Sequence, residues 1–157
     1  MKTKLTLFVA VLAVALFGIG CASVPDKLIE NPIIEDSIRI QLSKPSGQLT
    51  EADLDKVTSL ELINKGLTDA KELKKLTNLK ALDLGINKLT DISVLEGLTN
   101  LEFLSLSQNQ LTSVKSLEKL TKLKNLNLNI NPAITADQIA KLQKALPMCK
   151  IMHHATK

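Results

Sequence analysis

The side chains best suited to covalent or metal chemistry in this chain are two cysteines and two histidines. Cys21 follows an apolar run over residues 5–20, and Cys149 lies near the other end of the chain. His153 and His154 are adjacent, and they are the only histidines in the sequence. Two neighbouring histidines could touch a metal ion, but a metal site needs further ligands, which the sequence does not offer here. We therefore expect neither a metal site nor a cofactor.

A pair of acids is the other candidate for chemistry. Glu61 and Asp83 are 22 residues apart, which is also the period of a repeat in this sequence, so the two carboxylates should be neighbours in the fold. Paired acids that do acid–base chemistry lie in buried sites, whereas these two occupy positions that we expect to be exposed. The sequence also lacks a Ser/His/Asp, Cys/His or phosphate-loop arrangement. It therefore predicts a protein without enzymatic activity.

The 22-residue repeat covers residues 57–134 and decides which side chains can meet. Its units begin at Val57, Leu79, Leu101 and Leu123. Leucine occupies the fourth and sixth positions of every unit: Leu60, Leu62, Leu82, Leu84, Leu104, Leu106, Leu126 and Leu128. Two leucines separated by one polar or small residue have the period of a half-buried strand. Each unit should therefore supply one short strand, and no single unit can bury its apolar face without its neighbours.

The spacing of these residues resembles the leucine-rich repeat pattern L-x-x-L-x-L-x-x-N-x-L. The unit length and the phrase Leu89-Thr90-Asp91-Ile92 resemble the internalin-type class of bacterial repeats. The resemblance implies an α/β repeat solenoid, a short leucine-rich repeat arc with a parallel concave sheet, an N-terminal helical cap and a C-terminal helix. Positions 3, 5, 7 and 8 of each unit should face solvent on the concave side.

An asparagine recurs at the ninth position of three units, where the chain turns away from the strand. These residues are Asn87, Asn109 and Asn131, and Lys65 stands at the same position of the first unit. A buried asparagine there can satisfy backbone groups that the turn would otherwise leave unpaired. Each such group, if left buried without a partner, would cost about 1–3 kcal/mol. The alternative is an ordinary surface asparagine in a turn. The recurrence favours a buried structural ladder.

Residues 31–56 should form the N-terminal cap. Asn31 followed by Pro32 is a typical helix start, and Ile34, Ile38 and Leu42 then share one helical face. This cap precedes the repeats as it does in the proteins that the pattern resembles. It would cover the apolar end of the stack, which a solenoid otherwise leaves exposed.

Residues 135–157 should hold a C-terminal helix, an edge strand and a tail. Thr135 and Gln138 have the spacing of a capping box at the start of that helix. Residues 148–151 could add a final strand, with Cys149 facing the core. We therefore expect Cys149 to be a buried thiol rather than a reactive one.

Residues 1–20 have the basic start and apolar run of a secretory signal. The run of sixteen residues is shorter than the about 20 that a membrane-spanning helix needs. The segment from Phe17 to Cys21 resembles the bacterial lipobox, which implies cleavage before Cys21, lipid on its sulfur and palmitate on its new amino terminus. Residues 21–30 would then be a tether. The alternative is ordinary cleavage nearby, which would leave Cys21 an incidental thiol.

The remaining features indicate a protein-binding module. Removal of residues 1–20 takes away Lys2 and Lys4 and lowers the net charge from +4 to +2, which argues against nucleic-acid binding. We expect a monomeric domain, tethered to the bacterial cell envelope by lipid (to the outer membrane in a Gram-negative host), that binds a protein or peptide. The alternative is a non-lipidated secreted or periplasmic protein with a structural or spacer role. The predicted partner-binding residues are Glu61, Asp83, Phe103, Ser105, Asn125 and Asn127.

Overall fold

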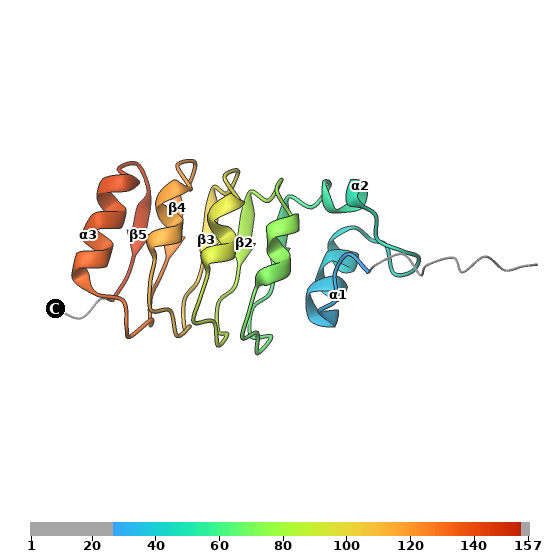
Figure 1. Ribbon diagram of the computed structural model, residues 1–157, viewed down its shortest axis with the longest axis horizontal. Helices are drawn as coiled ribbons and strands as arrows, with labels where there is room; N and C mark the ends of the chain where they lie inside the picture. The colour runs from blue at the N-terminus through green and yellow to red at the C-terminus, as the bar shows by residue number, and fades with distance from the viewer. Residues whose placement is uncertain (1–26, 155–157) are drawn as a thin grey trace, which may run out of the picture.

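The computed structural model of the protein describes residues 27–154, which form a row of stacked coils with a helical cap at each end (Figure 1). The predicted signal, the lipid attachment at Cys21 and the first part of the tether lie outside the described residues. Within residues 27–154, no helix combines the length and the apolar character needed to cross a bilayer.

Five short strands form one parallel sheet along the row. In chain order they are β1 (Ser59–Glu61), β2 (Ala81–Asp83), β3 (Phe103–Ser105), β4 (Asn125–Asn127) and β5 (Lys150–Met152). Each strand pairs only with its neighbours in sequence, and Leu60, Leu82 and Leu104 are register partners. The shift between partners is 22 residues in the first three pairs, so each repeat unit is one coil. The predicted leucine-rich solenoid with a parallel sheet is therefore confirmed.

Short 3-10 helices return the chain behind the sheet. They are η1 (Lys71–Lys75), η2 (Ser93–Gly97) and η3 (Lys115–Lys119). In η1 the Leu73 and Leu76 amides donate to carbonyls three residues earlier, at 3.0 and 2.9 Å, which is the 3-10 pattern. A coil of 22 residues must also contain the strand and two turns, so the return segment stays short.

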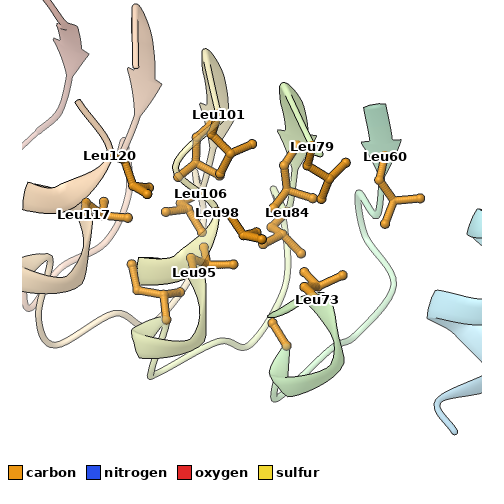
Figure 2. Packing of buried hydrophobic residues seen from close by; sticks show 14 of the residues in the cluster. Leu60, Leu73, Leu79, Leu84, Leu95, Leu98, Leu101, Leu106, Leu117 and Leu120 are labelled. Atoms are coloured by element: carbon orange, nitrogen blue, oxygen red, sulfur yellow. The ribbon is translucent and has the colours of Figure 1, made fainter. Parts of the chain in front are cut away.

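The core lies between the strands and the 3-10 helices and consists almost entirely of leucine. Figure 2 shows Leu84 and Leu106 approaching Leu95 from the sheet side, and Leu73 and Leu117 are buried in the adjacent coils. Full burial of a leucine side chain stabilises a fold by about 1.5–3 kcal/mol. The same column of leucines recurs in every coil, so each coil depends on its neighbours for most of this burial.

The N-terminal cap contains α1 (Pro32–Gln41) and α2 (Glu51–Leu54). The Asn31 side chain accepts a hydrogen bond from the Ile33 amide at 3.0 Å, and Ile34 and Ile38 are buried. A buried carboxylate joins this cap to the first coil: the Asn31 amide donates to both Glu72 oxygens at 3.1 Å. No sequence pattern indicated this contact, because it joins residues 41 positions apart.

The C-terminal cap contains α3 (Ala136–Ala145), followed by β5. The Gln138 amide donates to Thr135 Oγ1 at 3.3 Å, which is half of the predicted capping box. The other half is wrong, because Gln138 Oε1 accepts no hydrogen bond from the Thr135 amide. Gln138 Nε2 instead donates to the Thr112 carbonyl at 3.1 Å and so binds α3 to an earlier coil. Cys149 is 4% exposed, and its burial raises the pKa of the thiol.

Candidate interaction surface

The solvent-facing side of the sheet, called the concave face below, contains a depression of about 370 Å³ over the strands. All six of the residues predicted to bind a partner line it: Glu61, Asp83, Phe103, Ser105, Asn125 and Asn127. They meet because strand residues alternate between the two faces of a sheet, and the intervening leucines take the buried face. Met152 on β5 also lines the depression. Met152 was not predicted, because the strand expected from the sequence ended at residue 151, one residue before it.

Phe103 lies in the middle of the concave face. Its register partners are Ala81 on one side and Asn125 on the other. Ala81 is too short to cover the ring, so Phe103 remains 48% exposed. A half-exposed aromatic side chain that is surrounded by small and polar residues is a suitable anchor for a partner.

Glu61 and Asp83 line the same depression as this ring, on β1 and β2. They are register partners, so their backbones are about 4.8 Å apart. The acids that form ion pairs within residues 27–154 are Glu35, Asp53, Glu96 and Glu102. Neither Glu61 nor Asp83 is among them. Like charges directly opposite each other on a sheet are destabilising. The two acids therefore form a negative spot with no counter-charge from the described part of the chain.

The backbone next to Asp83 explains one departure from the predicted surface. Gly85 was expected to face solvent at the seventh position, but it is buried. A Cβ atom at Gly85 would lie 3.0 Å from Asp83 Oδ1 and 3.2 Å from Ser107 Oγ. The Gly85 amide donates to the same Asp83 oxygen at 2.8 Å. The absence of a side chain at Gly85 thus lets the Asp83 carboxylate fold back over the strand end.

Three exposed isoleucines follow the ends of the strands, and we call them the isoleucine rim: Ile63, Ile86 and Ile130. Their exposed fractions are 41%, 43% and 58%. Ile86 and Ile130 occupy the eighth position of their units, where the backbone is left-handed, with φ of 57° and 58°. Asn64 and Gln108 adopt the same conformation at the matching positions of the other two units. Ile86 and Ile130 thus lie on a turn that every coil repeats, and Ile63 directly precedes that turn in the first coil.

The asparagines at the ninth position form a buried ladder that joins consecutive coils. Asn87 Oδ1 accepts hydrogen bonds from the Lys65 and Leu67 amides at 3.1 and 3.0 Å. Its Nδ2 donates to the Leu62 carbonyl in the preceding coil at 2.8 Å and to the Leu84 carbonyl in its own coil at 2.9 Å. One side chain therefore closes a turn and fixes the stacking of two units.

Asn109 and Asn131 repeat the arrangement with fewer contacts. Asn109 Oδ1 accepts from the Leu89 amide at 3.0 Å, and Asn131 Oδ1 accepts from the Leu111 amide at 3.2 Å. The side chain of Lys65, at the same position of the first unit, is exposed. The contact between Asn31 and Glu72 joins the first coil to the cap in its place.

The rest of the described chain offers no obvious centre for metal chemistry. Residues 27–154 contain no group of three or more His, Cys, Asp or Glu side chains that could hold a metal ion. His153 and His154 follow β5 and are exposed.

Comparison with known protein families agrees with this architecture. Residues 55–111 match a family described as leucine rich repeat, and residues 99–144 match one described as leucine rich repeats in two copies. No curated protein sequence gives a significant match.

Solved structures of bacterial internalins share the fold. An internalin F from Listeria monocytogenes matches over 88% of this chain with a TM-score of 0.64 and 23% identity. Internalin J from the same species matches over 76% with a TM-score of 0.61 and 27% identity. This chain spans about half of the first structure and a quarter of the second, at 49% and 25% of their lengths.

Proposed function

We propose that this leucine-rich repeat protein is an exported interaction module of the bacterial cell envelope, that it binds a protein or peptide on its concave face, and that it is tethered through lipid on Cys21. Repeat solenoids commonly bind partners on the inner surface that their strands form. The single observation that carries the binding surface is the depression over β1–β4, which the half-exposed Phe103 ring shares with Glu61 and Asp83, two acids that form no ion pair within residues 27–154.

The size of the surface bears on how this module works. Five strands at about 4.8 Å spacing give a sheet about 19 Å across. A stable protein interface usually buries about 800 Å² on each partner, which is more than so narrow a strip supplies. We therefore expect weak contacts that gain strength from the isoleucine rim and from many copies held in one membrane.

Capture from envelope extract, with matched variants, tests the binding surface. A cross-linkable form of the protein should retain a partner that is lost with Phe103→Ala on the concave face. The same partner should remain with Lys115→Ala on the opposite side of the coil, at the start of η3. Equal retention by the two variants would count against the concave face.

Lipid labelling tests the anchor separately. Cells fed a palmitate analogue should label the wild-type protein and not Cys21→Ser, and the variant should leave the membrane fraction. The apolar run of sixteen residues is shorter than the about 20 residues that a membrane-spanning helix needs. The lipid would therefore be the main attachment of the protein to the membrane. Labelling that persists in Cys21→Ser, or wild-type protein recovered unlabelled from the soluble fraction, would refute the tether and support the non-lipidated alternative.

A further inference from the structure

We propose that the concave face binds an extended polypeptide segment that places a lysine or arginine on Glu61 and Asp83 and apolar side chains on Phe103 and the isoleucine rim. This inference rests on the proposed function and specifies the chemistry of the partner. It comes from two independent observations on the same surface, one about charge and one about exposed isoleucines on a left-handed turn.

The charge observation concerns what surrounds the two acids. Four acids of the described chain, Glu35, Asp53, Glu96 and Glu102, each contact a lysine or arginine side chain, and the other described acids do not. Glu61 and Asp83 are aligned on adjacent strands without one. A cationic side chain from outside would relieve their mutual repulsion and add attraction at the same point. The occupant should therefore carry a positive charge there.

The backbone observation concerns Ile86 and Ile130. A left-handed backbone is uncommon outside glycine, and it is a genuine outlier for a β-branched residue, whereas asparagine accepts it more readily. Asn64 and Gln108 show that polar residues also occupy this turn. The two isoleucines therefore combine a backbone penalty with large exposed apolar side chains. The stack imposes the turn itself, since all four units adopt it, but it does not require isoleucine there. An apolar contact with a partner would account for two large exposed apolar side chains at positions that polar residues suit better.

The two features are close enough for one short segment to reach both. Ile86 follows Asp83 by three residues in the same coil, after the turn at Gly85. Phe103 is one strand further along the sheet, on the register of Ala81. An extended peptide rises about 3.3 Å per residue and projects side chains to alternate sides. A few residues of such a peptide can therefore place a cation and two apolar groups on these positions.

Binding of defined peptide pools tests the inference. Three fluorescent pools of short random peptides serve as probes. The first pool contains Lys, Val and Ser, the second contains Glu, Val and Ser, and the third contains Lys, Gly and Ser. Fluorescence anisotropy with the mature wild-type domain should show binding of the first pool, and much weaker binding of the other two. The affinity of the first pool should fall as salt is added, because the charged contact is exposed.

Variants then assign the binding to the two features. Glu61→Gln with Asp83→Asn should weaken the first pool about fivefold, the effect of losing two exposed charge contacts. A matched control on other surfaces is Glu118→Gln with Asp137→Asn, which should leave the affinity unchanged.

The rim is tested by Ile86→Asn with Ile130→Asn, which should weaken the first pool about tenfold through lost apolar contact. Gln108→Asn at the same left-handed turn is the control and should have no effect. Thermal unfolding followed by circular dichroism shows whether the rim variant is folded, so that a loss of binding is not confused with unfolding. Asparagine suits the left-handed backbone better than isoleucine. The rim variant should therefore melt no lower than the wild-type protein.

Several results would overturn the inference. They are equal binding of the acidic pool, no binding of any pool up to its solubility limit, and insensitivity of the first pool to both the acid and the rim variants. Concentration-dependent self-association that the rim variant abolishes would identify a second copy as the occupant instead. If Phe103→Ala still abolishes capture from envelope extract, only the partner chemistry is wrong. If capture survives Phe103→Ala, the proposed function itself is wrong.

Discussion

Truncation of the asparagine ladder should destabilise the protein by amounts that follow the number of amides that each side chain satisfies. Asn87 accepts from two backbone amides, those of Lys65 and Leu67, and no other acceptor for either amide is found in the structure. Asn109 accepts from one, the amide of Leu89. Substitution by alanine leaves these amides inside the turn without a partner.

The magnitudes follow from the cost of an unsatisfied buried amide. At about 1–3 kcal/mol for each orphaned buried group, Asn109→Ala should lower the free energy of unfolding by about 1–3 kcal/mol. Asn87→Ala should lower it by about the same amount for the buried Leu67 amide, and by a further, smaller amount for the partly buried Lys65 amide. The carbonyls that lose the Asn109 amide are partly compensated, because the Leu84 carbonyl also accepts from Asn87 and the Leu106 carbonyl also accepts from Asn131. Asn87→Ala should therefore be the more damaging variant, although the two residues are chemically identical.

Urea unfolding followed by far-ultraviolet circular dichroism measures these differences, with the denaturant slope as a check that the same surface unfolds. Asn125→Ala is the matched control, because Asn125 is half-buried on the concave face and its side chain makes no hydrogen bond found among residues 27–154. Surface changes of that kind usually stay within about 0.5 kcal/mol. The reasoning is refuted if Asn87→Ala matches the control, or if Asn109→Ala is the more damaging variant.

Other predictions concern the core, the caps and the buried thiol. Leu104→Ala should lower the free energy of unfolding by about 2–5 kcal/mol in the same urea assay, and a change near zero would contradict the register of β3. The hydrogen bond from Lys44 holds the pKa of Asp53 well below its usual value. The stability that ionised Asp53 contributes should therefore be complete above about pH 4 and be lost as the pH falls further. Below about pH 4 the melting temperature should fall less steeply with pH for Asp53→Asn than for the wild-type protein. Burial raises the pKa of Cys149, so in a Cys21→Ser background an alkylating reagent should modify the folded protein far more slowly than the urea-unfolded chain, and equal rates would show that the thiol is open to solvent.

The repeat could be predicted from the sequence because its information is local and redundant. Each coil repeats the same leucine spacing, so an error at one position, such as Lys65 in the asparagine column, does not obscure the period. The strand and core positions follow directly, since every strand partner is one period away in the first three pairs. The residues that line the depression could be predicted for the same reason.

The contacts between unlike elements could not be predicted in this way. The Asn31 amide bonds to Glu72 across 41 residues, and the Gln138 side chain turns away from its own helix to the Thr112 carbonyl. Neither partner is set by a local pattern. The left-handed backbone at Ile86 was equally hidden, because isoleucine has no preference for that conformation and the turn is imposed by the stack.

The central claim is that the concave face is the surface that meets a partner, and site-specific photo-crosslinking in intact cells tests it most directly. A benzoylphenylalanine introduced in place of Phe103 lies in the depression, whereas the same group in place of Lys115 lies on η3, on the other side of the coil. We predict that light produces a protein adduct from position 103 and none from position 115. Adducts from position 115 alone, or equal adducts from both positions, would contradict the account.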